Sequence, residues 1–328
     1  MSEPLLRTDG LTRHFRVGKL FSGQVLHAVD DVNFEIGRGE IVALVGESGS
    51  GKSTIARLLA RVYKPTRGEI YFEGRPLSSL RGRKQRLAYA SDVPMVFQDP
   101  YSSINPAYRV SHGIKRALRL HRGGLARRPE VERVLGEVGL VPPGKMAGKF
   151  PHELSGGQRQ RVGFAQALAF SPKLIIADEP VSMLDVSIRI GLLNLMSELR
   201  EREGVSFLYI THDVASARYI ADRVLVMYAG HLVEEGPVED VIQRPKHPYT
   251  QLLLSAVPDP RAPLDVSAAA DVGEPPKVVN PKEGCRFRAR CPYAIAECET
   301  VTPLLRPLGP GRLAACHVAE ADVGEPAA

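Results

Sequence analysis

The chain has 328 residues, 43 of them Lys or Arg and 37 Asp or Glu, and its formal net charge of +6 is spread over many segments. A dispersed surplus of this size favours anionic partners only in general and identifies no class of protein. One hydrophobic core stops growing near ~250–300 residues, and no apolar run approaches the ~18–20 residues that span a bilayer, so we expect a cytoplasmic protein with one main domain and a small tail.

Up to about Tyr249 the sequence alternates short, apolar, β-rich runs with helix-like stretches. This pattern is typical of a parallel sheet covered by helices, so we expect an α/β fold. The predicted strands are 40–44, 95–97, 174–177, 206–210 and 224–227. The predicted helices are 54–62, 110–120, 130–138, 158–170 and 188–203. The last of these ends at Gly204, a residue that readily takes the left-handed conformation closing a helix.

Three breaks divide the chain. The stretch 105–150 contains no convincing strand, which predicts a helical subdomain, at about residues 103–160, inserted in a main domain of residues 1–258. Prolines then recur, which predicts a weakly ordered linker over residues 259–281. A C-terminal extension of residues 282–328 follows, and all four cysteines lie in it.

The segment 46–54 reads Gly-Glu-Ser-Gly-Ser-Gly-Lys-Ser-Thr and satisfies the pattern G-x-x-x-x-G-K-[ST] between a predicted strand and a predicted helix. Its glycines let the backbone wrap closely round phosphates, so that N–H groups and the helix N-terminus point at the anion. Lys52 should reach the β- and γ-phosphates of ATP, and the Ser53 hydroxyl should hold Mg²⁺. The candidate ATP-binding residues here are Gly46, Ser48, Gly49, Ser50, Gly51, Lys52, Ser53 and Thr54.

Two carboxylates, Asp178 and Glu179, follow the apolar strand 174–177. Parallel-sheet folds present their ligand sites at the carboxyl ends of strands. Asp178 should hold Mg²⁺ and Glu179 should polarise the attacking water. Without the phosphate-loop motif, the two acids could simply cap the next helix. With it, they predict the second half of a Mg·ATP site.

The segment 154–161, Leu-Ser-Gly-Gly-Gln-Arg-Gln-Arg, resembles the signature sequence that defines ABC-transporter ATPases. Physically, a serine and two glycines that open a helix make a second anion-binding helix N-terminus. The resemblance implies a P-loop NTPase fold of the ABC nucleotide-binding type. It also implies two ATPase subunits, identical or homologous, that enclose ATP between the phosphate loop of one and the signature of the other. The signature residues are Ser155, Gly156, Gly157 and Gln158.

Four further residues match this family in order along the chain. Gln98 resembles the glutamine that touches Mg²⁺ and the attacking water, and His212 resembles the histidine that contacts the γ-phosphate. Asp185 resembles the residue that communicates across the dimer. Phe15 resembles the aromatic that stacks on adenine, with His14 as a neighbouring alternative. The resemblance therefore implies Lys52, Glu179 and His212 as catalytic residues and Ser53, Gln98 and Asp178 as Mg²⁺ ligands.

Two segments, 97–106 and 247–258, resemble those of the oligopeptide, dipeptide and nickel importer ATPases. This implies a membrane permease as partner, a solute-binding protein as an indirect one, and a place on the cytoplasmic face of the membrane. The alternatives are another small solute, or a soluble ABC ATPase that acts on nucleic acid. We expect no nucleic-acid partner, because aromatic stacking residues are not interleaved in the basic stretches.

The cysteines of the C-terminal extension are Cys285, Cys291, Cys298 and Cys316. In a cytosolic chain such a cluster favours metal over disulfides, and the lack of a Cys-x-x-Cys pair argues against an ordinary zinc ribbon. Four thiolates suit a [4Fe–4S] cluster. The extension also resembles that of peptide-importer ATPases, some of which carry such a cluster. Zinc and reduced structural cysteines remain alternatives.

Overall fold

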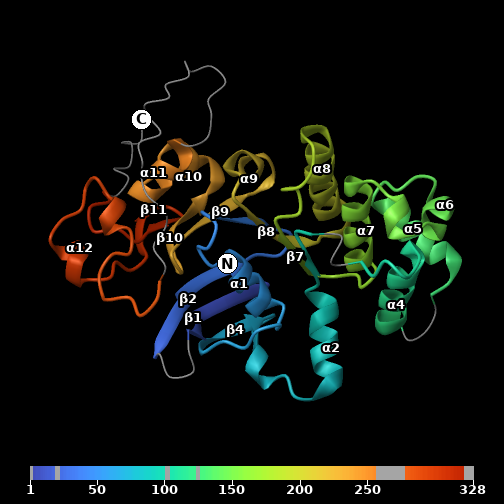
Figure 1. Cartoon of the computed structure of the whole chain (residues 1–328), viewed down its shortest axis with the longest axis horizontal. Coiled ribbons are helices and arrows are strands. Elements are labelled where there is room, and N and C mark those ends of the chain that lie inside the picture. The colour runs from blue at the N-terminus through green and yellow to red at the C-terminus, as the bar shows by residue number, and fades with distance from the viewer. Residues whose placement is uncertain (1–2, 19–22, 100–103, 123–125, 256–277, 321–328) are drawn as a thin grey trace.

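The structure is a computed structural model and describes residues 3–18, 23–99, 104–122, 126–255 and 278–320 (Figure 1). Residues 100–103 of the segment 97–106 and residues 259–277 of the predicted linker lie outside this description. Two sheets and the helices around them give the α/β fold that the sequence predicts. Among the described helices, none is both long and apolar enough to cross a membrane.

The main sheet has eight strands in the order β11-β12-β10-β9-β3-β8-β7-β6. Their bounds are β3 Ile41–Val45, β6 Met95–Val96, β7 Leu174–Asp178, β8 Ser206–Thr211, β9 Arg223–Tyr228, β10 His231–Pro237, β11 Arg306–Gly309 and β12 Arg312–Ala314. The five strands from β9 to β6 are parallel, and the other three continue the sheet in antiparallel pairs. The five predicted strands are these parallel ones, with ends that differ by one residue at most.

Both faces of the main sheet are buried, and alternate side chains of β3 show how. Ile41, Ala43 and Val45 pack in the core beneath the helices, whereas Val42 and Leu44 pack in a second core with α1 (Lys52–Leu59) and the smaller sheet. That smaller antiparallel sheet has the order β2-β1-β4-β5. Its bounds are β1 Leu6–Val17, β2 Gln24–Ile36, β4 Arg67–Phe72 and β5 Arg75–Pro76. Helix α2 (Gly82–Asp92) follows it.

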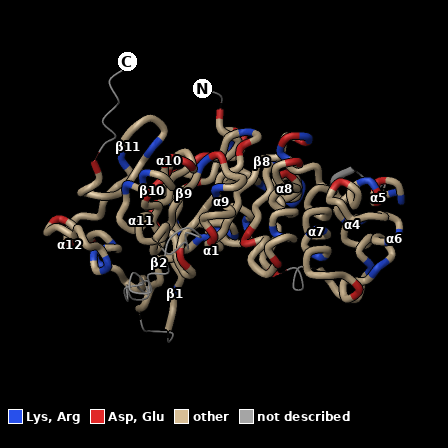
Figure 2. Tube along the Cα trace, turned by 90° about the horizontal axis from the view of Figure 1, so that it is seen from above, with Lys and Arg blue, Asp and Glu red and all other residues tan. Residues whose placement is uncertain are grey.

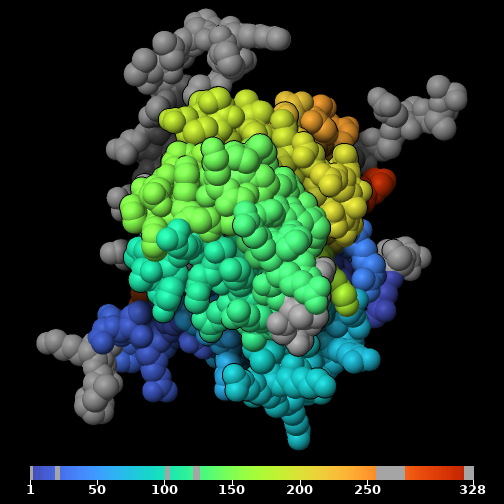
Figure 3. Space-filling model, turned by 90° about the vertical axis from the view of Figure 1, so that its right-hand side faces the viewer, coloured from blue at the N-terminus to red at the C-terminus, as the bar shows by residue number. Residues whose placement is uncertain are grey.

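Helices occupy the stretch before β7. Their bounds are α4 Val110–Arg122, α5 Arg128–Glu137, α6 Pro143–Gly148 and α7 Gly156–Leu168, with one 3₁₀ turn at Pro151–Glu153. They lie at one end of the molecule, and Figure 3 looks directly onto this helical face. Helix α7 begins there and leads back to β7 in the main sheet.

The remaining described α-helices follow β7 in the chain. Their bounds are α8 Val186–Glu203, α9 Val214–Ile220, α10 Val238–Gln243, α11 Pro248–Ser255 and α12 Glu297–Thr300. Helix α8 ends at Gly204 in the left-handed conformation (φ 68°), as the sequence predicts. Lys and Arg alternate with Asp and Glu along the described trace, so the net charge is dispersed (Figure 2).

The C-terminal tail packs on the main body. Strand β12 pairs with β10, and a buried ion pair between Arg312 and Glu234 (3.3 Å) joins the same two strands. At the end of the predicted linker, the Val278 carbonyl accepts from the His27 N–H (2.9 Å). The tail therefore extends the sheet that carries the phosphate loop, a connection that the sequence did not reveal.

Candidate active site

The phosphate loop leaves the buried strand β3 and ends where α1 begins. Gly51 has φ 111°, and a Cβ there would lie 2.2 Å from the Ala28 carbonyl oxygen. Gly46 has φ 154°, and a Cβ there would lie 2.2 Å from the Met227 carbonyl oxygen. Only glycine fits such close approaches of backbone to backbone, so this shape requires both residues.

Lys52 is buried beneath the loop, with 5% of its surface exposed. Its Nζ donates to the carbonyl oxygens of Gly46 (2.7 Å) and Glu47 (2.9 Å). Burial lowers the pKa of Lys52, while the charges of Glu179, Asp178 and Glu47 act in the opposite direction. The ammonium group thus lies among oxygen acceptors at the base of the loop, where a phosphate would offer it stronger, charged ones.

Ser53 and Asp178 meet beside the lysine. The Ser53 hydroxyl donates to Asp178 Oδ1 at 3.2 Å. Burial raises the pKa of Asp178, and the hydrogen bond from Ser53 partly offsets this. A hydroxyl and a carboxylate side by side are hard oxygen donors of the kind that Mg²⁺ prefers, so this pair fits the ion.

Gln98, Glu179 and His212 converge at the neighbouring strand ends. Gln98 Nε2 donates to Glu179 Oε2 (2.9 Å), and His212 Nδ1 lies 3.4 Å from the same oxygen. The Glu179 backbone is in the left-handed region (φ 46°), which is strained for a residue other than glycine, and its N–H is held by the Ile210 carbonyl (2.9 Å). The carboxylate is thereby fixed where it could take a proton from water.

Lys52, Ser53, Gln98, Glu179 and His212 share one cavity of about 860 Å³. It is lined by Phe15, Leu26, His27, Ala28, Ser48, Gly49, Gly51, Lys52, Ser53, Thr54, Gln98, Glu179, His212, Ala229 and Val278. Of the other ATP and Mg²⁺ candidates, Gly46, Ser50 and Asp178 do not line it. The sequence had not singled out Leu26, His27, Ala28, Ala229 or Val278, because they come from strands, turns and a tail with no motif.

Phe15 and His14 differ in what they contact. Phe15 lines the cavity, packs edge-to-face with Tyr63 (centroids 5.3 Å apart) and lies under the Arg13 guanidinium (4.5 Å). His14 instead turns to Asp30, with Nε2 at 3.1 Å from Oδ1. An aromatic face in the cavity wall suits adenine stacking, and of the two candidates Phe15 supplies it.

The signature residues do not reach this cavity. Ser155 is exposed at the N-terminus of α7, where its hydroxyl accepts from the Gln158 N–H (3.3 Å) and the Gln158 side chain accepts from the Ser155 N–H (3.2 Å). A Cβ on Gly157 would lie 2.4 Å from Ile188 Cγ2, so α7 and α8 approach closely here. Asp185, just before α8, is exposed beside the exposed apolar side chains of Met183 and Val186.

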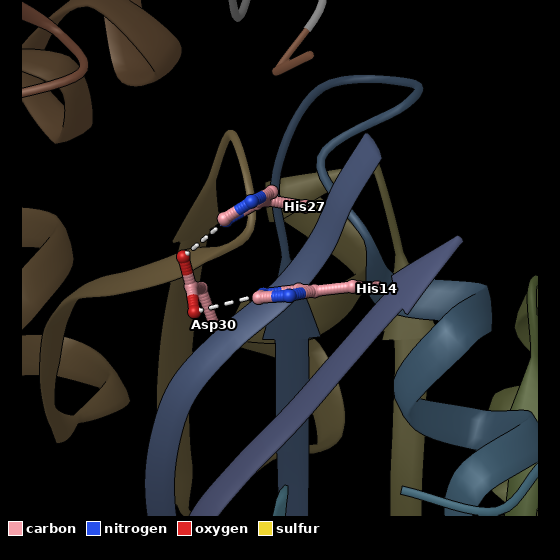
Figure 4. Close-up of side chains that lie close together, drawn as sticks. All are labelled: His14, His27 and Asp30. Atoms are coloured by element: carbon pink, nitrogen blue, oxygen red, sulfur yellow. Dashed lines mark hydrogen bonds and ion pairs between the residues drawn. The ribbon is translucent and has the colours of Figure 1, made fainter. Parts of the chain in front are cut away.

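A second polar cluster, missed in the sequence, links His14 of β1 with His27 and Asp30 of β2 (Figure 4), and Arg286 of the tail joins it. Asp30 accepts from His14, from His27 Nδ1 (2.9 Å) and from Arg286 Nη2 (2.6 Å). Burial alone would raise the pKa of Asp30, but its contacts with His231, His27, Arg286 and His14 hold it well below the usual range. The ligand atoms of His14, His27 and Asp30 lie within 4.8 Å of one another. Since Arg286 already balances the carboxylate, we assign the cluster a structural role.

The four cysteines are unpaired thiols, two of them buried. Burial raises the pKa of Cys285, and Cys298, Cys291 and Cys316 are near enough to raise it further. Within the described ranges, the cluster around Asp30 is the one group of three or more His, Cys, Asp or Glu ligand atoms all within 4.8 Å of one another. The thiols therefore influence one another, although no three of the sulfurs lie within 4.8 Å of one another.

A phosphate loop, paired carboxylates and a signature helix on this fold define an ABC-type ATPase. Residues 29–182 match the family model described as ABC transporter, and residues 233–298 match the one described as oligopeptide/dipeptide transporter, C-terminal region. The chain belongs to the ABC transporter family of ATP-binding proteins, which confirms the predicted family and the predicted ATPase class.

Among its relatives, the oligopeptide transport ATP-binding protein AppF of Bacillus subtilis is 43% identical over 96% of this chain and 98% of its own. Among solved structures, the dimeric ATP-binding cassette MJ0796 with ADP and Pi is 28% identical, with a TM-score of 0.63 over 71% of this chain and 98% of its own. CbiO1 of Clostridium perfringens, part of an ABC transporter complex, is 27% identical with a TM-score of 0.64 over 74% and 92%. These likenesses confirm the predicted fold.

Proposed function

We propose that this chain is the ATP-hydrolysing subunit of an importer for oligopeptides or dipeptides. The observation that carries the ATPase part is the single cavity lined by Lys52, Ser53, Gln98, Glu179 and His212. The transport part rests on the match of residues 233–298 to the oligopeptide/dipeptide transporter C-terminal region and on the name of AppF.

In this proposal each side chain acts on ATP from the position described above. Loop N–H groups and Lys52 bind the phosphates. Ser53 and Asp178, with Gln98, would hold Mg²⁺, which neutralises charge on the phosphate oxygens. Glu179 accepts a proton from the attacking water. His212, beside Glu179, contacts the γ-phosphate, and Phe15 stacks on adenine.

The working assembly extends beyond this chain. The exposed signature residues would close over ATP bound to a second ATPase subunit, identical or homologous, with Asp185 at the contact between the two. Membrane permease subunits would hold the pair at the cytoplasmic face, and a solute-binding protein would act through the permease. Nickel or another small solute is the alternative cargo, and a soluble ABC ATPase is the alternative class.

Reconstitution tests the function directly. The chain is assembled in liposomes with the permease, the ATPase partner and the binding protein encoded beside it, and uptake of a labelled dipeptide, a labelled oligopeptide and Ni²⁺ is measured with ATP inside. We expect peptide uptake that stops in a Lys52→Ala complex. Uptake of Ni²⁺ alone would select the alternative cargo. Co-purification with RNA or DNA and no permease would contradict transport.

For the tail, we further propose that Cys285, Cys291, Cys298 and Cys316 hold a [4Fe–4S] cluster, with zinc as the alternative. Mutual proximity of four buried or half-buried thiols supports this, since four thiolates are the usual ligands of such a cluster. Protein purified without oxygen should contain iron and sulfide and absorb in the visible range, and Cys298→Ser should lose both. Stoichiometric zinc without iron would reject the cluster.

A further inference from the structure

Arg290 of the tail reaches into the phosphate loop. Its Nη1 donates to Glu47 Oε2 (2.8 Å) and its Nη2 to Glu47 Oε1 (2.9 Å). Two parallel hydrogen bonds between a guanidinium and a carboxylate form a fork-to-fork pair, the strongest common geometry for such ions. Glu47 is the second residue of the loop, 243 positions away in the chain.

Packing fixes this arginine in place. Its guanidinium lies 5.7 Å from the ring centroid of Tyr228 and 5.8 Å from that of Phe287, and Nη1 is 3.4 Å from the Tyr228 hydroxyl. Only 11% of the Arg290 side chain is exposed, against 26% for Glu47. The hydrogen bond to Glu47, more than any other contact, raises the pKa of Arg290. An arginine whose side chain is largely enclosed and lies against two aromatic rings gives the carboxylate a rigid partner.

Glu47 is held at two further atoms. Its backbone N–H donates to the Tyr249 hydroxyl of α11 (2.8 Å), and its carbonyl accepts from Lys52 Nζ (2.9 Å). One residue of the loop therefore connects the tail, α11 and the phosphate-binding lysine. Fixing this residue fixes the direction of the next N–H groups, and a loop ordered before ATP arrives loses less entropy on binding.

A second tail arginine contacts Ala229, which lines the cavity. Arg286 donates to the Ala229 carbonyl (2.6 Å) and to Asp30 (2.6 Å), close to His27 in the cavity wall. Arg286 directly follows Cys285, and Arg290 directly precedes Cys291. The cysteine tail thus contacts both the phosphate loop and a residue of the cavity wall through arginines next to its thiols.

We propose that Arg290 is a positioning residue for ATP binding, that it holds the phosphate loop in its binding shape through Glu47, and that the cysteine tail is in this way part of the ATP site. This rests on the proposed role of residues 46–54 in binding ATP phosphates. Arg290 touches no reacting atom, so its effect should fall on ATP affinity rather than on the chemical step.

The test is a double-mutant cycle on the full chain with Arg290→Gln, Glu47→Gln and the double variant. Binding of a fluorescent ATP analogue with Mg²⁺, and KM and kcat for ATP, are measured beside the melting temperature of the nucleotide-free protein. Arg288→Gln is the matched control, because the hydrogen bond of Arg288 goes to the Cys285 carbonyl inside the tail. Arg290→Lys keeps the charge without the fork.

Each single variant should weaken ATP binding by about tenfold and raise KM equally with kcat little changed, and the double variant should be no weaker than either, because both remove one interaction. Arg290→Lys should recover part of the affinity, and Arg288→Gln should match the wild type. If Arg290→Gln leaves the affinity unchanged, or if its effect is undiminished when Glu47 is already Gln, the proposal is wrong. Should Arg290→Gln fail to fold, Glu47→Gln and Arg290→Lys carry the same test.

A Lys52→Ala variant separates this inference from the proposed function. If Lys52→Ala abolishes binding of the analogue and Arg290→Gln does not change it, the positioning role alone is overturned. If Lys52→Ala still binds the analogue with wild-type affinity, the assignment of the phosphate loop fails first.

Discussion

Two helix N-termini in this chain are the proposed anion-binding sites, and they lie in different surroundings. The N-terminus of α1 opens into a cavity that also contains Glu179, Gln98 and His212, and its lysine is buried. The N-terminus of α7 carries Ser155 exposed, and its signature residues do not line that cavity. At the first site, the candidate binding and catalytic side chains all come from this one chain. The second offers hydrogen-bond donors whose ligand must come from elsewhere, as a two-subunit ATP site requires.

The largest expected effect comes from replacing Glu179, because this removes the proposed proton acceptor and leaves the ATP-binding residues in place. Glu179→Gln keeps the shape of the side chain and a hydrogen-bonding oxygen but cannot accept a proton from water. Turnover should fall by about a thousandfold, with ATP affinity retained. Steady-state hydrolysis and equilibrium binding measure the two effects separately. Glu201→Gln, an exposed carboxylate of α8, is the control. Near-normal turnover in Glu179→Gln would remove Glu179 from the catalytic role.

Binding itself should depend on the buried lysine. When ATP binds, the Lys52 ammonium group should exchange its two carbonyl partners for phosphate oxygens. Lys52→Ala removes this cation, so ATP affinity should fall by about a hundredfold, or ~2.7 kcal/mol. Isothermal titration with ATP and Mg²⁺ gives this number. Lys173→Ala, which removes an exposed lysine paired with Glu73, should bind as the wild type does. Equal losses in both variants would point to a general charge effect instead of a site.

The stability of the protein should decrease in acid through His247, which lies next to the Tyr249 that accepts from the phosphate loop. Burial lowers the pKa of His247 to about 3, and its Nδ1 accepts from the Tyr249 N–H (3.0 Å). With a folded pKa below the unfolded value of about 6.5, the contribution of His247 to stability is complete above that value and is lost as pH falls. Lowering the pH from 7 to 5 should therefore reduce the free energy of unfolding by about 2 kcal/mol through His247.

Urea unfolding at both pH values measures this slope in wild type and in His247→Gln. The variant should be less stable at pH 7 but lose less stability on acidification. A slope identical to that of the wild type would show that other groups carry the pH dependence.

The smallest effect should come from removing the hydrogen bond that Gln98 donates to Glu179. Gln98→Ala removes the donor to Glu179, worth about 1.4 kcal/mol for a bond to a charged group, so turnover should fall about tenfold with ATP affinity little changed. Hydrolysis and binding by Gln98→Ala and Gln98→Glu give the comparison. A loss of ATP affinity as large as that of Lys52→Ala would show that Gln98 acts mainly by binding Mg·ATP instead of by orienting Glu179.

Local sequence information predicts the α1 cavity well. Continuous apolar runs mark the five parallel strands, because both faces of each are buried, and the loop between β3 and α1 is specified by glycines within nine residues. Strands β1 and β12 were not predicted, since their polar residues interrupt the apolar pattern. The contact of Arg290 with Glu47 joins residues with no shared motif, so only the folded tail reveals it.

The most direct test of the two-subunit account changes the signature and leaves the cavity intact. Ser155→Arg puts a bulky cation at the N-terminus of α7. The isolated chain should bind ATP with an affinity within about twofold of the wild type, while turnover by the assembled transporter should fall by at least about a hundredfold. Loss of ATP binding by the isolated chain would place Ser155 in its own ATP site. Undiminished turnover of the assembly would show that the signature takes no part in hydrolysis. Either result would contradict the account.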